Sequence, residues 1–308
     1  MPRAVQLDRY GSVDVLEVRE VPAPAPAPER VVVEVVATSI NPGEIGVREG
    51  AFRDQWPSTF PSGQGSDLAG RVVELGPDVT AWSVGDEVLG WTDERAAQAD
   101  LVSVPIDQLV AKPPALGWDE ASTLHVAGAA GWASVHAVAP RPGETVVVTG
   151  AAGGVGSVAV QLALRTGARV IGVAGAANQG WLTSLGAVAV PHGDGLAERL
   201  RAAAPDGLAA LADTYGNGYV DLALSLGVPL ERINTIIDFD AVQRLGVSAE
   251  GTSSAARAAV LEELAGLAAS GELQITIAAT YPLERVQQAY TELAQRHTRG
   301  KIVLRLRD

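Results

Sequence analysis

The glycines between residues 150 and 156 have the spacing of a phosphate-binding loop. The run "ETVVVTGAAGGVGSVAVQLAL" places an apolar β-type segment before them and a helical apolar pattern after them. Gly150 permits a tight turn, Gly153 lets the backbone approach a pyrophosphate, and Gly156 lets helix and strand pack closely. Gly153 is also expected to adopt a backbone conformation that favours glycine. The predicted dinucleotide-binding loop consists of Gly150, Ala151, Ala152, Gly153, Gly154, Val155 and Gly156.

The end of the next strand bears on which dinucleotide binds. Sites that prefer NAD place an Asp or Glu there, about 20 residues after the glycines, to bind the ribose 2′-hydroxyl. Here the positions from Ala174 to Asn178 read Ala-Gly-Ala-Ala-Asn, so no carboxylate is present to repel a 2′-phosphate. The loop supplies no Arg or Lys to pair with that phosphate either. NADP(H) is therefore the predicted cofactor, in contact with Ala174, Gly175 and Asn178.

These motifs need a parallel sheet to position them, and the second part of the chain predicts one. From about Trp118 onward, apolar β-type runs alternate with helical patterns, which is typical of a parallel sheet covered by helices. The expected strands are 144–149, 169–173, 188–190, 208–211 and 233–237, and the expected helices are 155–164, 178–185, 196–203 and 254–269. The tail returns to strand 274–279, helix 283–295 and strand 301–306.

The first third of the chain has a different pattern. Short β-type segments at 4–7, 13–18, 30–39, 69–75 and 86–89 are separated by Gly, Pro and Asp turns. They predict a compact, largely antiparallel, barrel-like domain. The Pro-rich run "VPAPAPAPER" is interpreted as a stiff connection between strands.

Composition excludes several classes of function. The 308 residues include no cysteine, which excludes disulfides, thiolate nucleophiles and cysteine-ligated zinc. The net charge of -13 argues against nucleic acid as a partner, and lysine occurs only at Lys112 and Lys301. No apolar run is long enough for a membrane span and no secretory leader is recognised, so a soluble cytoplasmic protein is expected, without a membrane partner.

Several longer stretches resemble one known superfamily. They are "ATSINPGEIGVREG", "GQGSDLAGRVVELGPDVTAWSVGDEVLG", "LHVAGAAGWASV", the glycine run, and "YPLERVQQAYTELAQRHTRGKIVL". Together they resemble the medium-chain dehydrogenase/reductase superfamily, in its zinc-independent quinone oxidoreductase and enoyl reductase group. The resemblance implies an α/β protein with a doubly wound Rossmann domain at 118–273 and a GroES-like β-barrel-type catalytic domain at 1–117 and 274–308. It also implies a cofactor in the cleft and a homodimer.

The resemblance assigns site residues one by one. Asn41 matches an asparagine that lies near the nicotinamide ribose and the substrate and positions them; as Asn-Pro it is alternatively only a turn residue. Ala130 takes the place of a threonine that contacts the nicotinamide end, so a hydrogen bond is lost. Gly46 and Phe52 stand where relatives place tyrosines. No proton donation by those tyrosines is therefore expected.

Other matches carry open alternatives. His192 lies at or beside an aromatic that flanks the adenine, or is a surface loop histidine. Tyr215 and Gly216, in "ADTYG", match a cofactor-lining "D-x-x-G", although Tyr215 is equally a candidate for packing. Glu44 and Asp67 are candidates for acid/base work, with loop-holding by hydrogen bonds favoured for Asp67. Four aromatic residues are expected to wall an apolar substrate pocket or to belong to the core: Phe52, Trp56, Trp91 and Trp132.

The zinc-dependent relatives place a cysteine near Asn41, a His-Glu pair near Ser66 and Asp67, and a four-cysteine lobe, and this chain lacks all of those cysteines. No metal is therefore expected. The predicted reaction is NADPH-dependent hydride transfer to a quinone or an activated C=C bond of a small molecule. Two alternatives stay open: a carbonyl or imine reductase of a secondary-metabolite pathway on the same fold, and a non-catalytic dinucleotide-binding sensor or structural protein.

Overall fold

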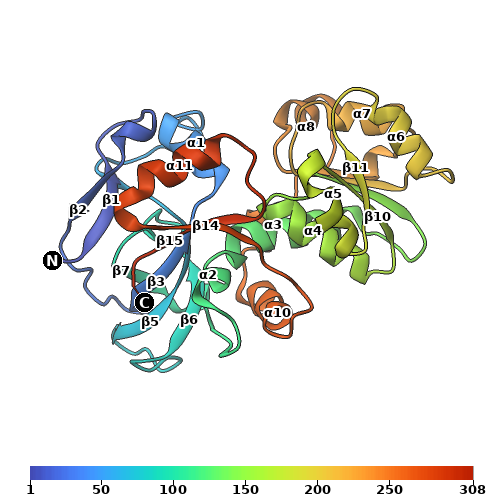
Figure 1. The fold of residues 1–308 in the computed structure, drawn as a ribbon. Helices are drawn as coiled ribbons and strands as arrows, with labels where there is room; N and C mark the ends of the chain where they lie inside the picture. Colours follow the sequence, from blue (N-terminus) through green and yellow to red (C-terminus); the bar gives the residue numbers. More distant parts are fainter. Residues whose placement is uncertain (308) are drawn as a thin grey trace. The chain divides into compact units, whose positions relative to one another are not determined.

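The computed structural model describes residues 1–307, and the chain forms two compact units (Figure 1). Unit 1 comprises Met1–Val126, Arg257–Glu272 and Thr276–Asp308, and unit 2 comprises Ala127–Ala256 and Leu273–Ile275. Unit 1 is therefore built from both chain ends. The domain boundaries at 117/118 and 273/274 stay predictions, and residue 308 of the predicted catalytic domain lies outside the described residues.

Unit 1 is a β structure with a seven-stranded and a three-stranded sheet. The larger sheet has the order β14-β15-β3-β5-β6-β8, with β7 paired to β3, and every pair in it except β14-β15 is antiparallel. Its strands are β3 (Arg30–Ser39), β5 (Asp67–Leu75), β6 (Glu87–Trp91), β7 (Leu101–Pro105), β8 (Leu109–Ala111), β14 (Ile277–Pro282) and β15 (Lys301–Arg305). The smaller sheet contains β2 (Glu17–Glu20), β1 (Arg3–Leu7) and β4 (Ser62–Gly63).

Few helices accompany these sheets. They are α1 (Pro42–Glu49), α2 (Trp118–Ala121), α10 (Ala258–Ala269) and α11 (Val286–Ala294), with short 3-10 turns η1 (Val13–Val15), η2 (Ile106–Gln108) and η6 (Leu283–Arg285). β3 is buried on both faces, since its five valines, at positions 31–33, 35 and 36, are at most 1% exposed, and it is hydrogen-bonded to strands on both edges. Across residues 1–307, no helix is long and apolar enough to cross a membrane.

Unit 2 is a parallel sheet with the order β11-β10-β9-β12-β13, the doubly wound order expected of a Rossmann domain. Its strands are β9 (Thr145–Thr149), β10 (Arg169–Ala174), β11 (Val188–Pro191), β12 (Ala210–Asp213) and β13 (Ile233–Thr235). Its helices are α3 (Ala129–Val138), α4 (Gly154–Arg165), α5 (Gln179–Ser184), α6 (Leu196–Ala203), α7 (Tyr219–Ser225), α8 (Phe239–Leu245) and α9 (Thr252–Ala255), with 3-10 turns η4 (Ala176–Asn178) and η5 (Leu230–Arg232). The predicted fold class is confirmed.

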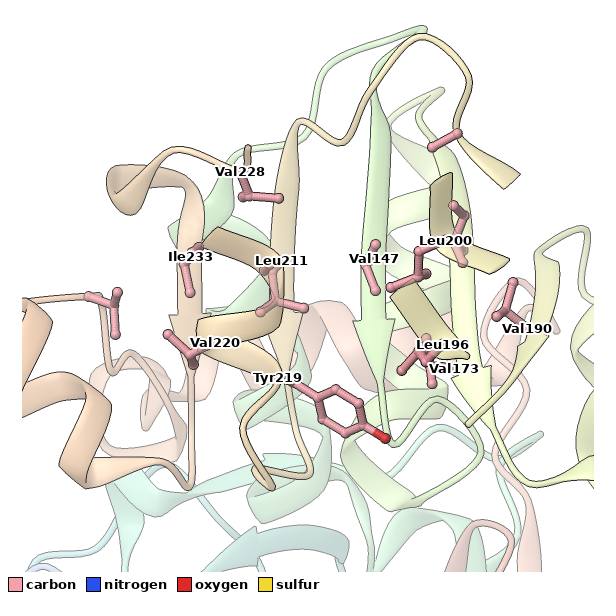
Figure 2. Close-up of a cluster of buried hydrophobic side chains, with 14 of the residues drawn as sticks. Val147, Val173, Val190, Leu196, Leu200, Leu211, Tyr219, Val220, Val228 and Ile233 are labelled. Carbon is pink, nitrogen blue, oxygen red and sulfur yellow. The ribbon is translucent and has the colours of Figure 1, made fainter. Parts of the chain in front are cut away.

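The core of unit 2 is an apolar cluster against one face of its sheet. Val147, Ile171 and Leu211 from the central strands are at most 3% exposed. Figure 2 shows the aromatic ring of Tyr219 at the end of the cluster toward which the strand arrows point. Burial raises the pKa of Tyr219, so its hydroxyl stays protonated at neutral pH. This packing fixes the carboxyl ends of the strands, where the predicted cofactor residues lie.

Two sequence expectations for individual elements are wrong. Residues 13–18 were expected as one strand, but a 3-10 turn at Val13–Val15 precedes β2. A single helix was expected over 254–269, but α9 ends at Ala255 and α10 begins at Ala258. Arg257 separates them because its backbone is extended, with φ -151° and ψ 146°. In both places apolar residues lie on either side of the backbone break, so the hydrophobic pattern of the sequence did not reveal it.

Candidate functional site

The glycine loop of unit 2 connects β9 to α4, and at two of its positions, Gly150 and Gly156, the structure requires glycine. Gly150 has φ +57°, the left-handed region that favours glycine. A Cβ on Gly156 would lie 2.1 Å from the carbonyl oxygen of Gly150, which no real side chain tolerates. The third differs, because Gly153 has φ -76° and ψ 178°, extended backbone that any residue adopts. The expectation that Gly153 needs a glycine conformation is therefore wrong.

The space beside Gly153 is nevertheless open. Within residues 1–307, a Cβ on Gly153 would have one neighbour inside 4 Å, the carbonyl oxygen of Gly150 at 3.3 Å. Gly153 is also the N-cap of α4, so the amides of the following helical turn have no partner inside the helix. These amides and the helix dipole attract an anion. β9 is the strand at which the sheet order reverses, where open α/β sheets bind dinucleotides.

Asp213, at the end of β12, joins the carboxyl ends of three strands. Its Oδ1 accepts a hydrogen bond from Thr149 Oγ1 on β9 at 2.5 Å, and its Oδ2 accepts one from Thr235 Oγ1 on β13 at 2.8 Å. The amides of Tyr215 and Gly216 donate to Oδ1 at 3.1 and 3.0 Å. Because Asp213 is fully buried, these bonds fix the turn that carries Tyr215 and Gly216 next to the end of β9.

The loop after β10 brings together residues that the sequence placed separately. His192 Nε2 lies 3.6 Å from the position of a Cβ on Gly175, and the His192 amide donates to the carbonyl of Ala174 at 3.2 Å. The Gln179 side chain donates to the carbonyls of Ala174 and Gly175 at 3.0 and 3.2 Å. Asn178 ends the short turn η4 of this loop. The imidazole therefore stands beside the position where an NAD site carries its carboxylate.

In unit 1, Asn41 lies where β3 ends and α1 begins. Its backbone is extended, and Pro42 takes the first helical position, where a missing N–H costs nothing. Asn41 is 4% exposed. Its Nδ2 donates to Glu44 Oε1 at 3.1 Å and to Asp67 Oδ2 at 2.8 Å. Its Oδ1 accepts a hydrogen bond from Lys301 Nζ at 2.5 Å. The amide of Asn41 thus contacts two carboxylates and one ammonium group.

Asp67, the first residue of β5, is 1% exposed and accepts hydrogen bonds from three protein groups. Its Oδ2 accepts from Ser39 Oγ and Asn41 Nδ2, each at 2.8 Å, and its Oδ1 accepts from the Val126 amide at 2.7 Å. Val126 belongs to a π-helical turn, η3 (Leu124–Gly128), a conformation frequent at functional sites. Asp67 therefore ties this turn to the end of β3.

Glu44 and Tyr290 form a second polar cluster next to Asn41. The Tyr290 hydroxyl donates to Glu44 Oε2 at 2.5 Å and accepts from the side-chain amides of Gln64 and Gln98 at 3.2 and 2.7 Å. Burial raises the pKa of Glu44, although the hydrogen bonds from Tyr290 and Asn41 act in the opposite direction. Burial and the Glu44 carboxylate raise the pKa of Tyr290 well above its usual value. Tyr290 therefore stays protonated and acts as the donor of this pair.

The four aromatic residues predicted for a substrate pocket have different surroundings. Trp91 is 3% exposed and stacks on His125, with ring centroids 4.4 Å apart. Burial lowers the pKa of His125, so its ring is neutral at neutral pH. Trp56 is 55% exposed, and its ring centroid lies 5.4 Å from that of Phe52. Trp132 belongs to α3 in unit 2. A shared pocket stays a prediction.

Sequence reasoning missed part of this site. It gave no role to Lys301 or to Tyr290, and Asn41 was not assigned as a helix cap. The spacing of Asn41 and Glu44 carried a signal, because Glu three residues after an N-cap binds the N-cap amide, as it does here at 2.9 Å. Lys301 was conspicuous as one of two lysines. Ala130 is buried in α3, and its contact with the cofactor stays a prediction.

Comparisons with known proteins agree with this architecture. A family model described as "Alcohol dehydrogenase GroES-like domain" matches residues 27–114, and one described as "Zinc-binding dehydrogenase" matches residues 238–304. The chain is 28% identical to the chloroplast envelope quinone oxidoreductase homolog of Arabidopsis thaliana, over 98% of this chain and 97% of that protein.

Two further relatives are informative. The 2-methylene-furan-3-one reductase of Solanum lycopersicum is 34% identical, over 50% of this chain and 42% of that protein. The solved structure of the quinone oxidoreductase from Coxiella burnetii superposes with a TM-score of 0.87 at 26% identity, covering 99% of each chain. The resemblance seen in the sequence is confirmed. This chain is an oxidoreductase that belongs to the medium-chain dehydrogenase/reductase superfamily, in its quinone oxidoreductase-like group.

Proposed function

We propose that this oxidoreductase uses NADPH to reduce a quinone or an activated C=C bond, such as that of an enone or enoyl compound, and needs no zinc. The observation that carries the proposal is the glycine loop after β9, with Gly156 packed against Gly150 and open space beside Gly153. The choice between acceptor classes rests on the relatives, which include a quinone oxidoreductase homolog and a furanone reductase.

The geometry of unit 2 supports a bound dinucleotide. The amides at the start of α4 would hold the pyrophosphate, together with the remaining residues of the loop, Ala151, Ala152, Gly154 and Val155. The absence of a carboxylate from 174–178 supports NADP(H), because a 2′-phosphate meets no negative charge there. His192 offers a ring nitrogen beside Gly175. Tyr215 and Gly216 stand at the switch point, where Asp213 holds their backbone.

A bound reduced nicotinamide supplies the hydride, and the protein places the reactants and excludes water. In unit 1, Asn41 positions the ligand. The hydrogen bonds of Glu44 and Asp67 to Asn41 favour a holding role for both carboxylates. Since Gly46 and Phe52 stand where relatives have tyrosines, backbone amides or solvent meet the negative charge that develops on the substrate oxygen.

Independence from zinc is supported by the donor set of the sequence. There is no cysteine in the chain, and cysteine ligands are typical of dehydrogenase zinc sites. In the part of the chain that the structure describes, no three His, Asp or Glu side chains are grouped to hold a metal ion. The homodimer and the cytoplasmic location expected from the sequence stay predictions, and sedimentation analysis measures the first.

The test is an acceptor screen with the purified protein after dialysis against a chelator. NADPH is supplied with a benzoquinone, an enone, a saturated ketone or an imine, and loss of the reduced nicotinamide is followed. The proposal expects saturable consumption with the quinone or the enone. Turnover with only the ketone or the imine would favour the alternative reductase reaction. Tight NADPH binding without turnover on any acceptor would favour a non-catalytic dinucleotide-binding protein.

A further inference from the structure

Lysine is rare in this chain, and both lysines are buried. The sequence contains 23 Lys and Arg residues, of which only Lys112 and Lys301 are lysines. They are 7% and 6% exposed, although lysine is among the residue types least often buried. Lys112 pairs with Glu87 at 3.2 Å and lies over the Trp118 ring, so a structural partner accounts for it. Lys301 instead donates to the candidate site residue Asn41.

The strand register determines this contact. β15 pairs antiparallel with β3, with Val303 opposite Ser39, so Lys301 falls opposite Asn41 when the register is extended by two residues. The Ile40 amide donates to the carbonyl of Ile302 at 3.1 Å, which continues the pairing to the strand ends. Figure 1 shows β15 running beside β3. The position of Lys301 is therefore fixed by backbone hydrogen bonds, independently of its side chain.

The side-chain contacts of Lys301 determine the orientation of the Asn41 amide. Lys301 Nζ donates to the carbonyl of Ile40 at 3.0 Å and to Asn41 Oδ1. An ammonium group only donates hydrogen bonds. If the Asn41 side-chain amide were flipped, its Nδ2, which is also a donor, would face Lys301 Nζ and no hydrogen bond could form. In the flipped orientation, the Asn41 oxygen would also face the carboxylates of Glu44 and Asp67. A single orientation of Asn41 is compatible with all three charged neighbours.

This orientation limits what Asn41 offers to a ligand. Both hydrogens of Nδ2 are used by Glu44 and Asp67. A carbonyl oxygen has two lone pairs, and one on Oδ1 is used by Lys301. Asn41 can therefore accept one further hydrogen bond and donate none. It suits a hydroxyl or an N–H of the ligand, such as a ribose hydroxyl, and does not suit the carbonyl oxygen of a quinone or an enone.

We propose that Lys301 is a positioning residue: its ammonium holds Asn41 so that Oδ1 presents a hydrogen-bond acceptor to a donor group of the bound dinucleotide. The inference rests on the proposed function of the site. An arginine would not replace it, because a planar guanidinium does not fit where a compact ammonium lies between Ile40 and Asn41. Burial lowers the pKa of Lys301, and Asp67 and Glu44 oppose this effect by favouring the charged form.

The first test observes the two lysines directly in the unaltered protein. Selective nitrogen-15 labelling of lysine gives one ζ-nitrogen signal for each, and Lys112→Met assigns them by removing one. Addition of NADP+ is expected to shift the Lys301 signal and to leave the Lys112 signal in place. In Asn41→Ala, the Lys301 signal is expected to move without ligand and to lose most of its response to NADP+. A Lys301 signal that ignores saturating, bound NADP+ would overturn the inference.

The second test separates positioning from stability by kinetics. Lys301→Met is compared with Lys112→Met, the matched loss of a buried lysine away from Asn41. Because a charged hydrogen bond is lost, we expect Lys301→Met to lower kcat/KM for NADPH about ten- to a hundredfold. The KM for the quinone or enone should change little, since Asn41 does not donate to it. The Asn41→Ala, Lys301→Met double variant should lose no more than Asn41→Ala alone.

These experiments distinguish a failure of the positioning role of Lys301 from a failure of the proposed NADPH-dependent reduction. If both methionine variants lose stability and kcat/KM equally, or if the double variant shows additive losses, Lys301 has no positioning role. Lys301→Arg, which keeps the charge but changes the shape, is expected to be impaired like Lys301→Met, and full activity would contradict the geometric argument. Failure of the proposed function would instead be seen in the unaltered protein, as no turnover with any acceptor.

Discussion

Replacement of Gly153 by valine separates cofactor binding from folding. The backbone of Gly153 is extended, so a valine there adopts an ordinary conformation. Its Cβ would meet the Gly150 carbonyl oxygen at 3.3 Å, a contact relieved by a shift of a few tenths of an ångström. Loss of freedom in the unfolded chain stabilises the variant by about 0.4–1 kcal/mol. The poorer N-cap offsets this by a similar amount, so the net change is expected to be within about 1 kcal/mol.

The same side chain is expected to abolish most cofactor affinity. It would fill the space beside the loop that the pyrophosphate needs, and we expect at least about a tenfold rise in the Kd for NADPH, which is about 1.4 kcal/mol. Two glycines serve as controls. Gly156→Ala places a Cβ 2.1 Å from a backbone oxygen and should destabilise the fold by about 1–3 kcal/mol. Gly266→Ala, in open space on α10, should stabilise the fold slightly and leave binding unchanged.

The assay combines calorimetric titration of NADPH with thermal unfolding in the absence of cofactor. A net change of about 1 kcal/mol in the free energy of unfolding corresponds to a shift in Tm of about 2–4 °C for a domain of about 150–250 residues. The expected pattern for Gly153→Val is a small shift in Tm with a large loss of affinity, and Gly156→Ala should show a large shift in Tm. A folded Gly153→Val variant that binds NADPH like the unaltered protein would refute the placement of the pyrophosphate on this loop.

Three further predictions use other parts of the structure. Gly175→Asp should weaken NADPH binding about tenfold or more, because the carboxylate repels the 2′-phosphate, and should leave NADH binding unchanged. An equal loss of affinity in titrations of both cofactors would contradict the placement of the 2′-phosphate beside Gly175. Dialysis against a chelator should leave turnover unchanged; a requirement for added zinc would oppose this. Burial acts to raise the pKa of Asp100, but the hydrogen bonds from Arg3 hold it below its ordinary value. The unaltered protein should therefore have a higher free energy of unfolding than Asp100→Asn. This difference should be full above the unfolded-state pKa of about 3.9 and vanish as the pH falls through the lower folded-state pKa, which unfolding measured at a series of acid pH values will show.

The sequence predicted the features that local patterns encode. The glycine spacing located the loop between β9 and α4, since strand, turn and helix are adjacent in the chain. The missing carboxylate after β10 was equally visible. The conformation of Gly153 could not be predicted. The spacing of the glycines shows which positions lack a side chain, but not whether the backbone conformation or a bound ligand requires glycine there. α3 was missed as well, because it is apolar around most of its surface and gives no helical periodicity.

The polar cluster of unit 1 depends on contacts between distant segments. Asn41 and Lys301 are joined by the β3-β15 register, which no local pattern reveals. Tyr290 contacts Glu44 from α11, a helix that is remote in sequence from α1. Family resemblance identified Asn41, and its hydrogen bonds then showed that both Nδ2 hydrogens are used by Glu44 and Asp67, so that the side chain can offer a ligand only an acceptor. Only the folded chain shows which polar side chains share the strand ends.

Hydride transfer from NADPH to an acceptor can be followed with NADPH that carries deuterium at the transferable C4 position. The purified protein is supplied with this cofactor and an enone, and the product is analysed by mass spectrometry and NMR. Direct hydride transfer should place one deuterium at the β-carbon of the saturated ketone, and Gly153→Val should fail to form this product. A reduced product without deuterium from the cofactor, or no reduction of any quinone or enone by protein that binds NADPH, would contradict it.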